Sequence, residues 1–170
     1  MKLEGSCHCG AVRFTMESSA PYPSMRCYCS ICRKTGGGGG YAINLMADAA
    51  TLTVEGEADM AVYQATLDSA LSPARRHFCK RSASALWVFD PTWPELIHPF
   101  ASAIDTPLPT PPETLHIMLD SKAAWTAVPD GDGHRHFPEY PDQSLEDWHR
   151  SHGFTRRRRR DPERQLRSCH

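Results

Sequence analysis

The sequence has 170 residues, of which 40% are hydrophobic, and a formal net charge of -1. This length fits one compact domain, and the balanced charge argues against a protein that binds nucleic acid over its whole surface. Residues 1–150 carry 12 Lys or Arg against 18 Asp or Glu, whereas residues 151–170 carry 7 against 2. We therefore expect one acidic domain, residues 1–154, and a basic, flexible tail, residues 155–170.

Seven segments have the composition and alternation of half-buried strands. A turn at Cys7–Cys9 comes just before the first of them, and the most apolar is Ala85–Phe89. Because evidence for helices is thin throughout, we predict an all-β fold with only short helical turns. The predicted strands are Gly10–Met16, Tyr41–Leu45, Leu52–Val54, Met60–Ala65, Arg75–Cys79, Ala85–Phe89 and His116–Leu119.

The C-terminal part of the sequence is rich in loop signals. Residues 91–141 hold 10 of the 14 prolines, which excludes long helices and favours ordered loops. His134 and His136 fall in this stretch beside a Gly/Asp-rich turn, and we interpret them as part of an exposed loop. Ser144–Arg150 has an acid three residues after its serine, which predicts one short helix. The run Arg156–Arg160 is typical of a solvated tail, although RNA or an acidic partner is a possible ligand for it.

The strongest chemical signal is a group of three cysteines within six residues, Cys27, Cys29 and Cys32. One tight loop can direct three thiolates to a single Zn²⁺ ion at Zn–S distances of about 2.3 Å. With no fourth ligand nearby, the site would keep one position for water or substrate, as catalytic zinc sites do. The alternatives are a closed structural zinc site completed from elsewhere and a set of buried thiols without metal.

A second group combines Cys7 and Cys9 with the distant Cys79. A metal ion held by these three residues would connect the start of the chain to its middle strands and stabilise a small core. Ser82 stands where a Cys-x-x-Cys pair beginning at Cys79 would end, and a neutral hydroxyl is a poor zinc ligand. Water, His8, His77 or Cys169 remain as fourth ligands, and loss of the metal is the other possibility.

Five glycines, Gly36–Gly40, follow the first cysteine group directly. Their backbone N–H groups could approach an anionic ligand such as a carboxylate, and Arg33 and Lys34 could attract the same anion. A flexible connector and two solvated basic residues are the competing interpretation. As a prediction, Arg33, Lys34, Gly36 and Gly37 are the candidate substrate-binding residues.

The cysteines also bear on the cellular compartment. Close Cys-x-Cys pairs rarely have disulfide geometry, and Met1–Gly5 leads into polar sequence without the apolar region of a signal peptide. No apolar run approaches the roughly 20 residues that span a bilayer. We predict a protein of the reducing cytoplasm that has no membrane partner.

These motifs together resemble one known family. The segments Gly5–Val12, Cys27–Lys34 with Gly36 and Gly37, and Phe78–Cys79 are similar to motifs of the glutathione-dependent formaldehyde-activating family, which includes centromere-protein-V-like proteins. His116–Ile117, Asp120–Lys122, Trp125 and Pro129–Asp130 resemble its closing motif. The resemblance covers roughly residues 3–150, and its cysteine spacing is the most specific part.

The resemblance implies an Mss4-like β-rich fold, two zinc sites and a lyase reaction between formaldehyde and the thiol of glutathione. Cys27, Cys29 and Cys32 match the family's catalytic zinc ligands. Cys7, Cys9 and Cys79 match three of its four structural ligands, while Ser82 replaces the fourth cysteine. The zinc at this second site would then take Ser82 or water in the fourth place.

Our leading functional hypothesis is a zinc-dependent carbon–sulfur lyase, similar to S-(hydroxymethyl)glutathione synthase, whose partners are a small thiol and a small aldehyde. The thiol is expected to be glutathione. The alternative is a non-catalytic, zinc-stabilised binding module whose basic tail contacts a protein or nucleic acid. The sequence leaves the oligomeric state open.

Overall fold

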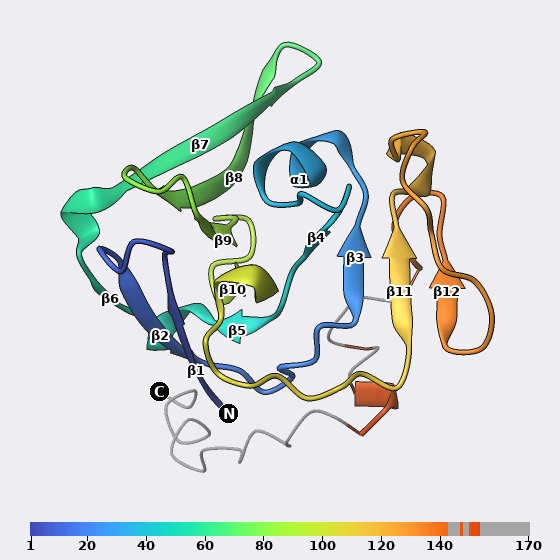
Figure 1. The fold of residues 1–170 in the computed structure, drawn as a ribbon, viewed down its shortest axis with the longest axis horizontal. Coiled ribbons are helices and arrows are strands. Elements are labelled where there is room, and N and C mark those ends of the chain that lie inside the picture. Colours follow the sequence, from blue (N-terminus) through green and yellow to red (C-terminus); the bar gives the residue numbers. More distant parts are fainter. Residues whose placement is uncertain (143–146, 148–149, 154–170) are drawn as a thin grey trace, which may run out of the picture.

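The computed structural model describes residues 1–142, 147 and 150–153, and it confirms the all-β prediction (Figure 1). Three sheets and only short helical turns make up this part of the chain. The α-helix described over its whole length is α1 (Ser30–Thr35), and the 3-10 turns are η1 (Ala49–Thr51), η2 (Glu57–Asp59), η3 (Ala101–Ala103) and η4 (Leu119–Ser121). No described helix is long and apolar enough to cross a membrane.

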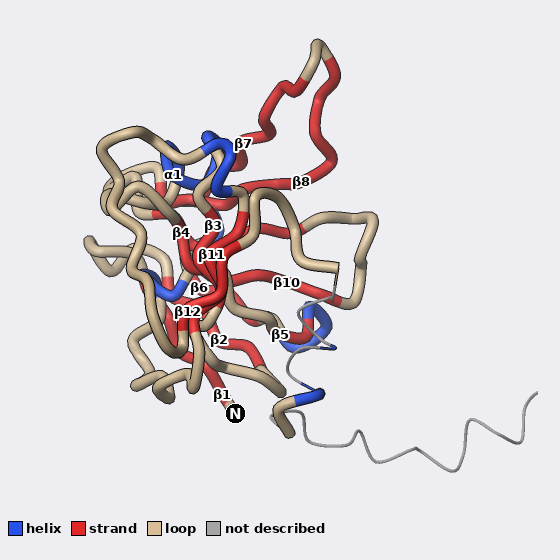
Figure 2. The backbone as a smooth tube through the Cα atoms, turned by 90° about the vertical axis from the view of Figure 1, so that its right-hand side faces the viewer, coloured by secondary structure: helices blue, strands red, loops and turns tan. Residues whose placement is uncertain are grey.

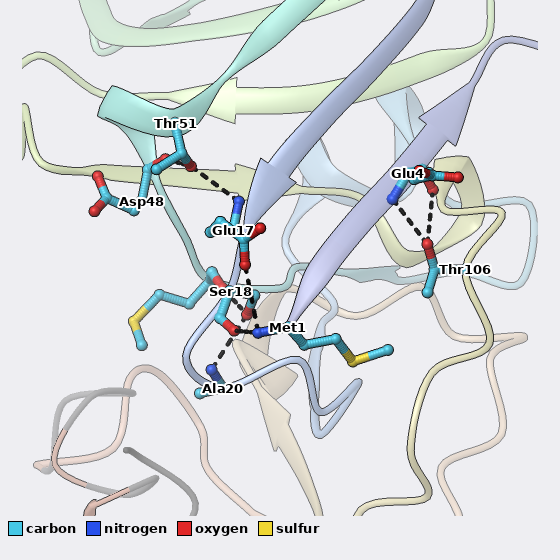
Figure 3. A network of polar contacts seen from close by, with 9 residues as sticks. Met1, Glu4, Glu17, Ser18, Ala20, Asp48, Thr51 and Thr106 are labelled. Atoms are coloured by element: carbon cyan, nitrogen blue, oxygen red, sulfur yellow. Dashed lines mark hydrogen bonds and ion pairs between the residues drawn. The ribbon is translucent and has the colours of Figure 1, made fainter. Parts of the chain in front are cut away.

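The first sheet has the order β1-β2-β6, with β1 (Lys2–Ser6), β2 (Arg13–Glu17) and β6 (Thr53–Glu55). Figure 3 shows how its ends are held. The Met1 nitrogen donates to the Ser18 carbonyl at 2.7 Å, and the Glu17 N–H donates to the Thr51 hydroxyl at 2.9 Å. The Glu4 N–H donates to the Thr106 hydroxyl at 2.8 Å, so a loop 102 residues away is tied to the first strand.

The second sheet has the order β5-β10-β9-β8-β7 and contains the longest strands. Its strands β7 and β8 form a hairpin that extends beyond the rest of the molecule (Figure 2). Successive side chains of β9 point to opposite faces. Trp87 packs in a core with residues of the first sheet, whereas Val88 packs against Cys27 and its neighbours. The strands of this second sheet are β5 (Ala47–Asp48), β7 (Met60–Leu67), β8 (Ala70–Cys79), β9 (Ala85–Phe89) and β10 (Leu96–Pro99).

The third sheet has the order β12-β11-β3-β4 and contains the start of the first cysteine group. Its strands are β3 (Met25–Cys27), β4 (Ala42–Ile43), β11 (Thr114–Ile117) and β12 (His134–His136). β11 pairs in parallel with both β3 and β12, and the three lie side by side in Figure 1. In this register Ile117 lies opposite Cys27, so a strand 90 residues later in the chain supports the first metal-ligand candidate.

Several sequence predictions differ from the structure. The loop expected at His134 and His136 is wrong, because both residues belong to β12, which β11 pairs by backbone hydrogen bonds. The strand expected from Gly10 begins at Arg13, because Gly10 has a φ of 73° and lies in a turn. Of the predicted helix Ser144–Arg150, the described residues Asp147 and Arg150 are helical, and the others lie outside the described residues, as does the whole predicted tail 155–170.

Candidate metal centre

The structure brings Cys27, Cys29 and Cys32 together as the sequence spacing predicted. Cys27 ends β3, Cys29 caps the N-terminus of α1, and Cys32 lies inside that helix. Their three sulfur atoms lie within 4.8 Å of one another. Tetrahedral thiolates at about 2.3 Å from Zn²⁺ are roughly 3.8 Å apart, so this donor set fits zinc. We call these residues the first triad.

Local hydrogen bonds already favour one thiolate in the first triad. The Cys32 backbone N–H donates to the Cys29 sulfur at 3.3 Å. Hydrogen bonds from the Cys27 and Cys32 thiols lower the pKa of Cys29. The hydrogen bond between Cys27 and Cys29 also raises the pKa of Cys27. A positively charged ion that replaces the shared protons would ionise the whole group, because metal-bound thiols lose their protons.

Burial in the first triad is unequal. Cys27 and Cys32 are 3% and 5% exposed, whereas Cys29 is only half-buried. Leu115, Ile117 and Phe100 pack around the two buried thiols. The triad is therefore closed by apolar side chains on one side and reachable by solvent on the side of Cys29.

The second group, Cys7, Cys9 and Cys79, also converges, and we call it the second triad. The Cys9 sulfur lies 3.4 Å from that of Cys7 and 3.7 Å from that of Cys79. These separations are close to those of zinc thiolates, so the second triad also fits the metal. Cys9 is exposed and the other two thiols are buried.

Ser82 lies where a fourth ligand to the second triad would be expected. Burial raises the pKa of Cys79, but hydrogen bonds from the Ser82 hydroxyl and backbone outweigh it and lower the pKa to about 6. The hydroxyls of Ser82 and Ser84 are 2.9 Å apart. The serine thus stabilises the Cys79 thiolate through a hydrogen bond, which is a weaker contribution than a fourth thiolate ligand.

Comparison with known proteins places this arrangement in a family. The family described as glutathione-dependent formaldehyde-activating enzyme matches residues 2–121, which include both triads. The chain belongs to this family. A Halomonas elongata protein, named provisionally as a glutathione-dependent formaldehyde-activating enzyme, is 62% identical over 149 residues, which are 88% of this chain and 95% of that protein. The chain is also similar to a crystal structure of a Rhodobacter sphaeroides protein, at 28% identity and a TM-score of 0.48, over 64% of this chain and 92% of that one.

The four residues that the sequence suggested for substrate binding lie outside the triads, within the part of the chain that the family matches. Arg33, Lys34, Gly36 and Gly37 all line one cavity of about 690 Å³, together with Cys7, His8 and Asp105 among others. The first triad does not belong to the described lining, because α1 has Cys29 at its N-terminus and the cavity at its C-terminus. The four residues are therefore close together in space, and their role in binding stays a prediction.

The glycine segment at this cavity is ordered by close contacts. A side chain on Gly37 would lie 1.8 Å from the Tyr41 carbonyl oxygen, and one on Gly40, whose φ is +87°, would meet Thr126 at 2.3 Å. The Gly40 N–H donates to the Gly37 carbonyl at 3.1 Å. A tight turn thus accounts for two of these glycines, and a flexible connector does not.

A buried hydrogen-bond chain beside the first triad was not expected from the sequence. Tyr28, between two ligand candidates, contacts Nδ1 of the fully buried His116 through its hydroxyl at 2.8 Å. Nε2 of His116 lies 3.0 Å from Nδ1 of His134. Burial, followed by the charges of Arg26, His136 and His134, lowers the pKa of His116 to about 4. A neutral imidazole can accept at one nitrogen and donate at the other, so this chain fixes the loop that carries the triad.

Proposed function

We propose that this protein joins formaldehyde, or a similarly small aldehyde, to the thiol of glutathione at the first triad. The observation that carries the proposal is the unequal burial of three converging thiols, because it leaves one accessible side next to Cys29. Family membership and the 62% identical relative support the same activity. The reaction is that of an S-(hydroxymethyl)glutathione synthase. In the reverse direction, which splits the carbon–sulfur bond of the adduct, the same enzyme is a carbon–sulfur lyase.

The reaction needs no oxidant or reductant. The glutathione sulfur forms a bond to the aldehyde carbon, the carbon–oxygen π bond breaks, and the thiol proton ends on the new hydroxyl oxygen. A thiol of pKa about 8.5 is only a few per cent ionised near neutral pH, so ionisation of the incoming thiol limits the uncatalysed reaction. Zinc bound by the first triad would supply this ionisation and a Lewis acid for the aldehyde oxygen.

The chain's own residues prepare the site for this chemistry. Cys27 and Cys32 hold their sulfurs in an apolar environment, where charge interactions are stronger than in water. Tyr28 and His116 fix the backbone between the ligand candidates by their 2.8 Å hydrogen bond. The half-buried Cys29 leaves space for two small reactants to meet on the same side.

Arg33, Lys34, Gly36 and Gly37 remain our proposed contacts for an anionic part of the substrate. Two basic side chains and the backbone of the glycine turn face one cavity, which is a suitable arrangement for a carboxylate. Asp105, which accepts a hydrogen bond from Ser6 at 2.7 Å, is the opposing charge in this cavity. We also propose that the protein acts in the reducing cytoplasm, where free thiols persist.

The proposal is tested by exchange NMR on the zinc-loaded protein with ¹³C-formaldehyde and glutathione. We expect the protein to accelerate formation of the carbon–sulfur bond above the rate in buffer. Cys29→Ala should abolish this acceleration, whereas Cys9→Ala, which removes an exposed thiol from the second triad, should retain it. If the wild-type protein gives only the buffer rate, the enzyme proposal fails and the binding-module alternative is favoured.

A further inference from the structure

Arg76, which the sequence analysis did not single out, points toward the first triad. On β8 it lies directly opposite Val88 of β9, and Val88 packs against the core that contains Cys27 and Cys32. Directly opposite residues of an antiparallel pair share one face of the sheet. The next residue, His77, lies opposite Trp87 and stacks on its ring at 5.0 Å on the other face.

The guanidinium of Arg76 has donors that no described group uses. Its Nε and Nη1 atoms are buried and have no hydrogen-bond partner among the described residues. No carboxylate of the described residues forms an ion pair with it either. Buried N–H donors without an acceptor are costly, which indicates that a ligand supplies the missing acceptor.

The surroundings of Arg76 indicate where this ligand lies. The hydrogen bond with Cys27 lowers the pKa of Cys32, but the hydrogen bond with Cys29, burial and the charge of Cys29 outweigh it and raise that pKa. The nearby Arg76 guanidinium acts in the lowering direction. Partial desolvation, followed by the charges of the three sulfurs, raises the pKa of Tyr140, while Arg76 lowers it. Arg76 and Tyr140 are thus both close to the sulfurs, although they come from distant parts of the chain.

Tyr140 lies where the first triad meets solvent. The preceding residue, Glu139, accepts a hydrogen bond from the Met118 N–H at 3.0 Å, and Met118 packs against the triad core. The Tyr140 side chain is 70% exposed. A ligand at the open side of the first triad would therefore find the Arg76 guanidinium and the exposed Tyr140 phenol near the sulfurs.

We propose that Arg76 is the residue that binds a carboxylate of the thiol substrate at the first triad. The inference rests on the proposed function and specifies which part of the thiol is recognised. A planar guanidinium suits carboxylates better than a lone sulfur, because it offers several donors in fixed directions. The ligand class is accordingly a thiol with a carboxylate, such as glutathione, and thiols without an acidic group bind without help from Arg76.

The test is calorimetric titration of zinc-loaded wild type, Arg76→Gln and Arg75→Gln with two thiols, glutathione and 2-mercaptoethanol, the second of which has no carboxylate. Arg75 is the matched control, because it is an exposed residue of the same strand with the same charge. We expect Arg76→Gln to weaken glutathione binding roughly ten- to one-hundred-fold and to leave 2-mercaptoethanol binding unchanged. Arg75→Gln should change neither affinity.

Other outcomes separate this inference from the proposed function. If Arg76→Gln binds glutathione as wild type does, the inference is wrong while the enzyme proposal stands. Equal weakening for both thiols would also overturn it, since Arg76 would then balance the charge of the sulfurs alone. If wild type does not bind glutathione, both proposals fail. Zinc content and thermal melting of each variant check the fold, and Arg76→Lys, which retains the charge, should recover part of the glutathione affinity.

Discussion

The two triads each combine three thiols, but the fold assembles and buries them in different ways. The first comes from a six-residue segment, has two ligands buried in an apolar core and keeps its third half-buried. The second joins Cys7 and Cys9 to a residue 70 positions later, with its middle thiol exposed. A local group needs little of the fold to assemble and can serve chemistry, whereas a long-range group contributes its binding energy to folding.

Neighbouring groups sharpen this difference. The Arg76 guanidinium, with two buried donors that no described group accepts from, and the Tyr28–His116 hydrogen bond lie next to the first triad. Beside the second triad are two serines that hydrogen-bond each other. An arginine thus acts on the sulfurs of the first triad. Serine hydroxyls lie beside the second triad, whose Cys7 also lines the cavity of Arg33, Lys34 and Asp105.

The largest expected effect is on activity when Cys29 is changed. Cys29→Ala should remove the accessible ligand of the first triad and lower the rate of carbon–sulfur bond formation by more than about 100-fold. Mutating a residue that only hydrogen-bonds to a metal ligand already lowers activity about 10- to 100-fold, and losing the ligand itself should lower it at least as much. Zinc analysis should show one fewer ion per chain, and circular dichroism should retain the strand signal even if α1 loses its cap. Full activity in this variant would show that the first triad is not the reaction centre.

Cys79→Ala should instead reduce stability. Removing this ligand opens a loop of about 70 residues that the metal would close, and we expect a loss of roughly 2–4 kcal/mol in the free energy of unfolding. Urea denaturation of zinc-loaded protein measures it, and chelated wild type is the control. A loss confined to activity would reverse the roles that we assign to the triads.

Ser82→Cys should strengthen the second triad. The serine already hydrogen-bonds Cys79, so a thiol at the same position can reach the metal. We predict higher zinc content, at least about tenfold slower loss of zinc to a chelator, and a higher melting temperature. If the metal stoichiometry and the melting temperature do not change, the hypothesis that the second triad lacks a fourth ligand at position 82 is wrong.

The smallest effect concerns His116 and pH. Because its folded pKa of about 4 lies below the ordinary value near 6.5, the unfolded chain binds more protons between these values. Its contribution to stability is complete above pH 6.5 and is lost as pH falls toward 4. His116→Gln should show a shallower pH dependence than wild type over this range in urea denaturation. Identical slopes would mean that His116 does not titrate as a buried neutral group.

Local pattern predicted part of the fold. The apolar segment Ala85–Phe89 forms β9 with those bounds, because its period and composition agree with its partners. β1 was missed because Lys2–Ser6 has few residues that favour strands, and its pairing with β2 decides its structure. β12 consists of polar residues and forms through parallel pairing with β11. The short helix α1 depends on Cys29 as its cap, a role that cysteine spacing did not reveal.

The candidate site, like the fold, was predictable only where local sequence brings its residues together. The thiols of the first triad were predictable because they lie within one tight loop, and the second triad was proposed from the remaining cysteines and matched by the family's motifs. Arg76 was not, because only the register between β8 and β9 turns it toward Cys32 rather than toward Trp87. His116 and Tyr28 meet through the pairing of β3 with β11, which is also a long-range contact.

The most direct measurement of the central claim is the visible absorption of cobalt-substituted Cys9→Ala protein during titration with glutathione. This variant lacks a ligand of the second triad, so the spectrum reports on the first. We predict a change in the cobalt bands that saturates at one glutathione per chain, because the thiol enters on the open side of the first triad. A spectrum that does not change at saturating glutathione would contradict direct binding of the substrate at this centre.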